Sequence, residues 1–169
     1  MPHLTHQPAN YQYRITKFDP ANRDPAGHYL AEDWHLYSQI GEAFGGVVLT
    51  AEEYLRVESA YIATAQRFHL ESGLPAIRAV AVEGHRDRGA PGEAEVILPE
   101  RLPAICRAML RGEYWCRIQG DGFFIHFGWD FYMYVGAPHP CEAALEYARS
   151  LNLFPEVFTS PYHPEEESG

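Results

Sequence analysis

The chain has 169 residues, of which 46% are hydrophobic and 21% charged, the composition of a globular protein rather than a disordered one. Its 23 acidic residues outnumber its 13 lysines and arginines, which gives a formal net charge of −10. This balance argues against a nucleic-acid binder and against a protein that docks on an anionic membrane, because both need clustered cations. It suits a basic protein partner, since complementary fields speed the encounter of two proteins.

The cysteines and the N-terminus favour a cytoplasmic protein without a disulfide framework. The cysteines are odd in number, and their wide spacing fits neither paired disulfides nor a zinc motif: Cys106, Cys116 and Cys141. The N-terminus carries no recognisable signal peptide, and the sequence contains no apolar run long enough to span a bilayer. Glycine-rich phosphate-binding motifs are absent and the nine histidines follow no established metal spacing, so we expect no cofactor and no metal.

The first half of the chain is predicted to hold one strand and one long helix after a loose leader at residues 1–10. Tyr11–Phe18 alternates imperfectly but is rich in β-branched and aromatic residues, which indicates a strand. A short helical turn is expected near Ser38–Ala43. The long helix begins at Thr50, which forms a capping box with the glutamate three residues later, and an apolar stripe at three- and four-residue steps runs to a stop at Gly73.

The second half of the chain is predicted to combine further strands with two shorter helices. The expected strands are Ala76–Val82, Trp115–Gln119 and a short final one within Leu153–Phe158, while Glu95–Leu98 is either a strand or the approach to the next helix. The expected helices are Leu102–Gly112 and Cys141–Leu151, and residues 162–169 form an acidic tail. The order of elements indicates a single α+β domain: a mostly antiparallel sheet of about four to five strands with two to three helices packed on it.

The most informative stretch of the sequence is Phe123–Val135, in which side chains alternate in character. Successive residues of a strand point to opposite faces of the sheet, so the parity of the residue number sorts them. The odd positions are all apolar: Phe123, Ile125, Phe127, Trp129, Phe131, Met133 and Val135. The even positions are mixed: Phe124, His126, Gly128, Asp130, Tyr132 and Tyr134. We therefore expect a core face on one side and a second, polar and aromatic face on the other.

Two backbone geometries fit this segment. Gly128-Trp129-Asp130 can form a three-residue hairpin loop that pairs Phe127 with Phe131 and His126 with Tyr132. Alternatively, the segment is one long strand with a bulge at Gly128. Thirteen residues exceed the usual length of a strand, so the hairpin is preferred.

Three interpretations of the second face remain open. It can be covered by a helix, which would leave its tyrosines half-buried and merely hydrogen-bonded. It can be a protein-binding surface, because tyrosine and tryptophan are favoured at interfaces; the candidate binding residues are Phe124, His126, Trp129, Asp130, Tyr132 and Tyr134. It can also be a catalytic wall, in which Asp130 orients His126 as a general base and Tyr132 serves as an acid or anchor.

Three stretches of the sequence carry a family resemblance: His126–Tyr134, Tyr13–Phe18 with Arg23-Asp24, and Leu49–Glu58. Together they resemble a family of small uncharacterised bacterial proteins, and the likeness extends from Tyr11 to Tyr162. Relatives in that family occur beside polymorphic toxins, as immunity-type proteins do. The resemblance therefore implies a protein that neutralises a basic toxin domain, and it implies no catalytic residues.

Overall fold

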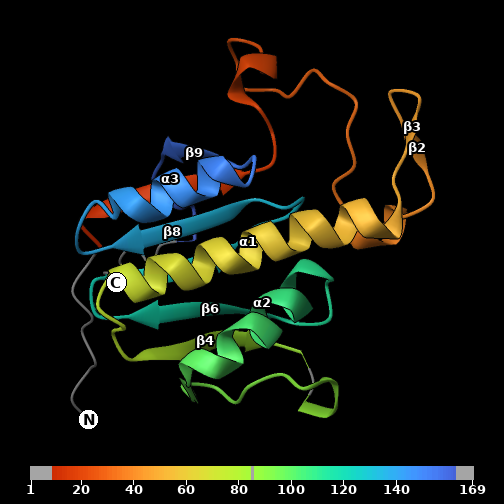
Figure 1. The fold of residues 1–169 in the computed structure, drawn as a ribbon. Helices are drawn as coiled ribbons and strands as arrows, with labels where there is room; N and C mark the ends of the chain where they lie inside the picture. The colour runs from red at the N-terminus through yellow and green to blue at the C-terminus, as the bar shows by residue number, and fades with distance from the viewer. Residues whose placement is uncertain (1–8, 85, 163–169) are drawn as a thin grey trace.

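The computed structural model describes residues 9–84 and 86–162, and these residues build one large antiparallel sheet with helices on a single face (Figure 1). Within them the chain forms nine strands and three α-helices. The strands are β1 Tyr11–Thr16, β2 Ala43–Phe44, β3 Val47–Val48, β4 Ile77–Glu83, β5 Val96–Ile97, β6 Trp115–Gly120, β7 Phe123–Phe127, β8 Met133–Ala137 and β9 Phe154–Val157. The helices are α1 Ala51–Glu71, α2 Leu102–Leu110 and α3 Glu142–Ser150.

The α+β class expected from the sequence is confirmed, but the expected sheet of four to five strands is too small. In the described part of the chain seven strands join in the order β5-β4-β6-β7-β8-β1-β9, and every neighbouring pair is antiparallel. The edge strands β5 and β9 are only two and four residues long. Both fall within segments that the sequence marked as a possible strand, Glu95–Leu98, and as a short final strand, Leu153–Phe158. The expected number of strands was too low because segments this short show too little alternation to be counted with the sheet. The expected leader and tail lie outside the described residues except for Ala9, Asn10 and Tyr162.

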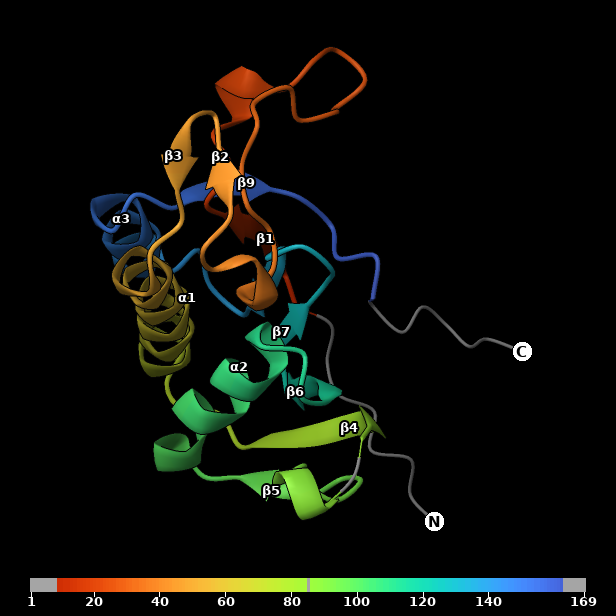
Figure 2. The same ribbon diagram turned by 90° about the vertical axis from the view of Figure 1, so that its right-hand side faces the viewer.

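The long helix α1 forms for the reasons its sequence suggests. The Thr50 side chain accepts a hydrogen bond from the Glu53 backbone N–H over 3.1 Å and so caps the first turn. The predicted apolar stripe is buried along the whole helix: Tyr54, Val57, Tyr61, Ala65 and Phe68. Figure 2 shows α1, α2 and α3 together on one side of the sheet, where they cover the apolar face of β7 and β8. In the described chain no helix is both long and apolar enough to cross a lipid bilayer.

Strands β7 and β8 form the preferred hairpin, but its register differs from the predicted one by two residues. Ile125 pairs with Val135, and His126 pairs with Tyr134. The loop therefore contains five residues, 128–132, instead of three. It is closed by a hydrogen bond of 2.7 Å from the Gly128 N–H to the Tyr132 carbonyl. A shift of two residues keeps the parity of each strand, so the predicted division into two faces survives.

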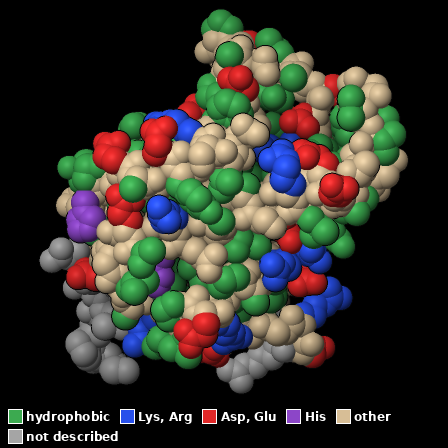
Figure 3. Space-filling model, viewed as in Figure 1, with side chains coloured by type: hydrophobic (Ala, Val, Ile, Leu, Met, Phe, Trp, Pro, Cys, Tyr) green, Lys and Arg blue, Asp and Glu red, His purple; other side chains and the backbone are tan. Residues whose placement is uncertain are grey.

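The short helical turn expected near Ser38–Ala43 is present in part, since it begins one residue earlier and is shorter than predicted. A short 3-10 helix spans Tyr37–Gln39, and strands β2 and β3 then form a small hairpin around Gly45-Gly46. Both glycines have positive φ angles, which suit the tight reversal. This hairpin projects beyond the sheet at the upper right of Figure 1, and its hydrophobic side chains are visible at the same place in Figure 3. Val47 is 70% exposed there.

Candidate functional site

The second face of the sheet is covered, though by a strap rather than a helix. After β9 the chain turns back across the sheet on the side away from the helices (Figure 2). Arg14 secures the start of this strap: its guanidinium bonds both carboxylate oxygens of Glu156 and lies 4.1 Å from the centroid of the Phe158 ring. The Gln12 side chain accepts from the Ser160 N–H over 3.0 Å. We call residues 158–162 the C-terminal strap.

His126 lies beneath this strap and is 0% exposed. The Gln119 amide nitrogen lies 2.8 Å from His126 Nε2, and Ser160 Oγ lies 2.9 Å from His126 Nδ1. Each ring nitrogen therefore has a hydrogen-bond partner within the protein, so neither faces a substrate as a general base. The imidazole thus joins the strap to the sheet.

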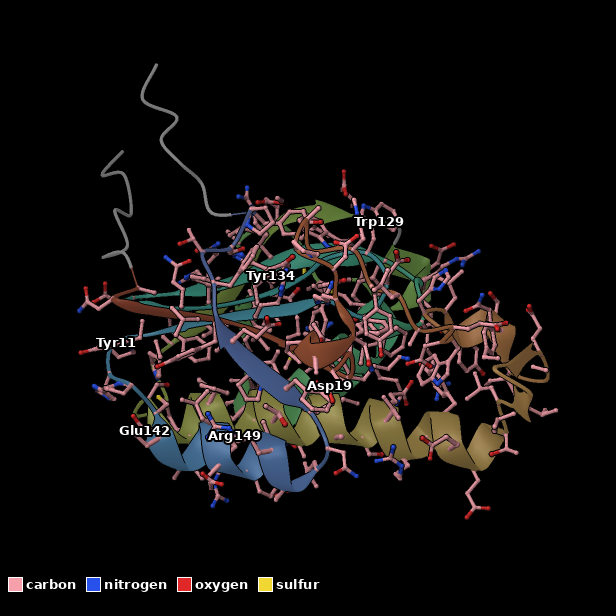
Figure 4. All side chains as sticks on the ribbon, turned by 90° about the horizontal axis from the view of Figure 1, so that it is seen from above. Tyr11, Asp19, Trp129, Tyr134, Glu142 and Arg149 are labelled. Carbon is pink, nitrogen blue, oxygen red and sulfur yellow. The ribbon has the colours of Figure 1, made fainter. Side chains whose placement is uncertain are left out.

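Two further residues of the second face share this burial. Phe124 lies above Gly136 on the paired strand, where a Cβ atom would come within 2.2 Å of the Phe124 ring. The Phe124 ring also stacks on the His126 imidazole, with 4.2 Å between the ring centroids. Tyr134 lies among the aromatic rings of the strap, 5.9 Å from both Phe158 and Tyr162 (Figure 4). Burial raises the pKa of its phenol. Phe124, His126 and Tyr134 are therefore part of the packing, not of a displayed surface.

The structure does not bring His126 and Asp130 together as an oriented acid–base pair. His126 is buried beneath the strap, whereas the Asp130 side chain is 52% exposed at the tip of the β7–β8 loop. There Asp130 lies 4.0 Å from Nε2 of His35, which belongs to the segment before β2. Tyr132 is half-buried, and its hydroxyl accepts a hydrogen bond from Arg23 over 2.9 Å. The three residues of the catalytic hypothesis thus occupy three separate environments.

Trp129 is the residue of the segment whose position departs most from the predicted core face. It is 82% exposed and stands at the edge of the molecule (Figure 4). The loop reverses through Asp130 and Phe131, whose φ angles are +64° and +67°. Phe131 turns inward and is fixed by Tyr61, whose hydroxyl donates to the Phe131 carbonyl over 2.7 Å. A rigid anchor on one side of the loop therefore holds Trp129 out in solvent on the other.

A cleft of about 530 Å³ opens beside Trp129. It lies between the β7–β8 loop, the segment 35–38, the C-terminal end of α2 with residues 111–115, and the end of the strap. Its aromatic lining is Tyr37, Tyr114, Trp115, Phe127, Trp129, Phe131 and Tyr162. One indole is held in place, since Trp115 Nε1 donates to the Phe127 carbonyl over 2.6 Å. The volume falls in the usual range for sites that bind a small ligand or a side chain. We call this the loop cleft.

Acidic side chains dominate the charge of the loop cleft. The lining includes three exposed carboxylates, those of Glu83, Glu113 and Asp130. Its lysines and arginines are represented by Arg111. Within the described chain, neither Glu83 nor Glu113 forms an ion pair with a lysine or arginine. These carboxylates face solvent at a cleft with aromatic walls, so the site favours a cation over an anion.

The positive charge of Arg111 in the cleft is offset in part by a buried glutamate, which Arg111 shares with Arg107. Its Nε and Nη2 atoms bond the two carboxylate oxygens of Glu58 at 2.8 and 3.0 Å, and its guanidinium lies 4.6 Å from the Tyr37 ring centroid. Glu58 is 1% exposed. Burial alone would raise the pKa of the Glu58 carboxyl, but hydrogen bonds from Arg111, Tyr54 and Arg107 outweigh it and hold the pKa below its usual value. The network fixes one wall of the cleft.

The cysteines offer no reactive thiol at neutral pH. All three are buried and free. Burial raises the pKa of Cys116 to about 12 and that of Cys141 to about 11, and it raises the pKa of Cys106 further above its usual value. Among the described residues, no group of three or more histidine, cysteine, aspartate or glutamate side chains is placed to hold a metal ion.

Sequence reasoning missed the residues that make the strap and the cleft. Ser160 is the partner of His126, yet it lies 34 positions away in a segment expected to be the approach to a tail. His35, Arg111 and Glu113 come from two other parts of the chain. Short patterns in the sequence do not reveal such long-range contacts. No protein-family model matches the chain, and no curated protein or solved structure matches it either.

Proposed function

We propose that the chain is a cytoplasmic protein-binding domain and that it binds a basic partner through the loop cleft and Trp129. One observation carries the proposal: an 82% exposed tryptophan lines the same cleft as three exposed carboxylates. Tryptophan is prominent among residues that dominate binding energy, and full exposure of so large an apolar ring is costly unless a partner covers it. An acidic border around it steers a cationic protein to the same place.

The distribution of ion pairs supports a partner that supplies positive charge. Most lysines and arginines of the described chain already serve acids or carbonyls within it. The ion pairs are Arg14–Glu156, Lys17–Asp33, Arg56–Glu53, Arg101–Glu95, Arg107–Glu58, Arg111–Glu58 and Arg149–Glu146. With the formal charge at −10, the acids left over are the groups available to a partner. The carboxylates of the loop cleft belong to this surplus.

The specific form of the proposal is an immunity-type protein that neutralises a basic toxin domain. It rests on the family resemblance of the β7–β8 segment and on the charge. Such a protein needs a preformed surface more than a reaction centre. The loop fits this need because Phe131 and Tyr132, which directly follow its exposed tip, are both held by hydrogen bonds from other segments.

Affinity capture with point variants tests the proposal. The tagged full chain is used to capture proteins from a lysate of its organism of origin at low and at high salt. We expect a basic protein to be retained at low salt by the unaltered chain and by Glu142→Gln, but poorly by Trp129→Ala. Glu142 is a suitable control because it is exposed at the far end of the molecule from Trp129 (Figure 4).

Two outcomes would count against the proposal. If no basic protein is retained at low salt, the chain is not the acidic half of a charge-complementary pair. If the Trp129→Ala chain retains the same basic protein as well as the unaltered chain does, the partner binds elsewhere on the surface. Because Trp129 is exposed, the alanine variant keeps the core intact, and an unchanged melting temperature verifies this.

A further inference from the structure

We propose that the loop cleft receives an arginine side chain of the partner, with its guanidinium over Trp129 and its charge met by Asp130 and Glu113. This inference rests on the proposed function, since it names the chemical group that the same surface recognises. Its basis is the combination of an unoccupied aromatic ring, a surplus of carboxylates and an apolar floor within one cleft.

The aromatic rings of this chain are paired with cations in several places, and Trp129 is left without one. The Arg111 guanidinium lies 4.6 Å from the ring centroid of Tyr37, at the cleft itself, and Lys17 Nζ lies 4.1 Å from that of Trp34. Among the side chains that the structure describes, those of residues 9–84 and 87–162, no lysine or arginine lies over the Trp129 ring. Tryptophan is the strongest aromatic acceptor for a cation. The ring thus presents an open face to a cation from outside.

The charges around the cleft favour a cationic occupant. Asp130 directly follows Trp129 in the loop, and Glu113 lines the same cleft from the turn between α2 and β6. The one arginine of the lining, Arg111, is already held by Glu58. His35, 4.0 Å from Asp130, is partly exposed and can move aside when a stronger cation arrives. An incoming guanidinium therefore finds carboxylates from two segments of the chain.

The apolar floor of the cleft selects arginine over lysine. Met109, Leu110 and Phe127 line the cleft together with the aromatic rings. An ammonium group is strongly hydrated and loses much of its hydration on such a floor, whereas the flat guanidinium is weakly hydrated and stacks on a ring. A guanidinium also bonds a carboxylate through two parallel hydrogen bonds. The same positive charge is consequently bound better on an arginine.

Short peptides test this directly on the full chain. The probes are acetylated five-residue amides in which a central arginine, lysine, citrulline or glutamate is flanked by glycines. Binding is followed by the NMR signal of the Trp129 indole N–H, which is identified by its loss in Trp129→Phe. We expect saturable binding of the arginine peptide, at least about fivefold weaker binding of the lysine peptide, and no saturable shift with the citrulline or glutamate peptide.

Matched variants locate the site. Asp130→Asn is well suited because asparagine tolerates the positive φ of this position. We expect Trp129→Ala, Asp130→Asn and Glu113→Gln each to weaken the arginine peptide by about twofold to fivefold. Because Trp129→Ala lacks the indole, its binding is followed by the backbone amide signals of residues 128–132, which are first titrated in the unaltered chain. Glu142→Gln should leave its affinity unchanged. All four positions are exposed, so each variant keeps its fold, which the NMR spectrum itself verifies.

The inference is overturned if the arginine peptide gives no saturable shift, if citrulline or lysine binds as well as arginine, if only glutamate gives a shift, or if the three cleft variants leave binding unchanged. Its failure is distinguishable from failure of the proposed function. A basic protein captured through Trp129 while the arginine peptide gives no saturable shift would refute the arginine pocket and leave protein binding intact. Saturable arginine binding without any captured protein would support the pocket and refute the proposed partner.

Discussion

Substitution of Tyr61 by phenylalanine should loosen the loop that presents Trp129. The Tyr61 ring is 0% exposed, and its hydroxyl makes two hydrogen bonds to the backbone. It donates to the Phe131 carbonyl over 2.7 Å and accepts from the Lys17 N–H over 2.8 Å. One hydroxyl on α1 thus ties the end of β1 to the tip of the β7–β8 loop. Phenylalanine keeps the ring and removes both bonds.

The cost of Tyr61→Phe follows from the two backbone groups left without this partner. A buried polar group deprived of its hydrogen bond costs about 1–3 kcal/mol. The Phe131 carbonyl is buried and takes the larger share, while the Lys17 N–H is only partly buried and takes the smaller one. We expect a loss of about 2–4 kcal/mol in the free energy of unfolding. For a chain of this size the melting temperature should fall by about 4–16 °C.

Urea unfolding and thermal melting measure this loss, with Tyr147→Phe as the matched control. Tyr147 is half-buried on α3, where its ring contacts Arg67 at 5.0 Å. We expect the control to change stability by less than about 0.5 kcal/mol. A loss below about 0.5 kcal/mol for Tyr61→Phe would refute the reasoning, because it would mean that neither backbone group depends on the hydroxyl. Faster amide exchange of the loop residues should accompany the loss.

Three further predictions concern charge and the strap. Glu58→Gln should destabilise the chain by about 2–3 kcal/mol at neutral pH, since it weakens the bidentate pair with Arg111. Because the folded-state pKa of Glu58 is lowered, the gap between the two proteins in urea titrations should close as pH falls below about 4.5. Burial lowers the pKa of Lys17 to about 8, whereas the unfolded chain holds that proton to about pH 10. The free energy of unfolding of the unaltered chain should therefore rise between about pH 8 and about pH 10 relative to that of Lys17→Met. A difference between the two free energies that stays flat or falls over this range would contradict the prediction. Ser160→Ala should cost about 1–2 kcal/mol and speed hydrogen exchange at the Tyr162 amide, which donates to the Ser160 hydroxyl; unchanged exchange would show that the hydroxyl does not hold the strap.

The parts of the fold that could be predicted are those that depend on residues close together in the sequence. Thr50 and the stripe that begins at Tyr54 define α1, because capping and a 3.6-residue period act within a few turns. The parity of the β7 and β8 side chains also predicted the core face. Side chains of a strand must alternate, so a shift of the register by two residues leaves Ile125, Met133 and Val135 in the core.

The parts that were not predictable depend on contacts between distant segments. Trp129 has the parity of the core, but a loop of five residues with left-handed Asp130 and Phe131 breaks the alternation and turns the indole outward. The cover over His126 comes from Ser160, which local composition assigns to a loop. The loop cleft is formed by several segments that are distant in the sequence, so no single sequence motif predicts it.

The candidate binding surface lies at the tip of one hairpin and not, as the sequence had suggested, on a face of the sheet. Of the six residues expected to bind, Phe124, His126 and Tyr134 are buried and Tyr132 is half-buried. Trp129 and Asp130 remain exposed, and the loop cleft adds acids that the hairpin alone does not contain. An exposed tryptophan and three exposed carboxylates thus lie at one cleft.

The most direct test of this account is the affinity of the captured, purified partner for the unaltered chain, Trp129→Ala and Glu142→Gln, measured by calorimetry at low salt. The account predicts equal affinities for the unaltered chain and Glu142→Gln, and a loss of about tenfold or more for Trp129→Ala, as expected for a tryptophan at the centre of an interface. Equal affinities for all three proteins would contradict it.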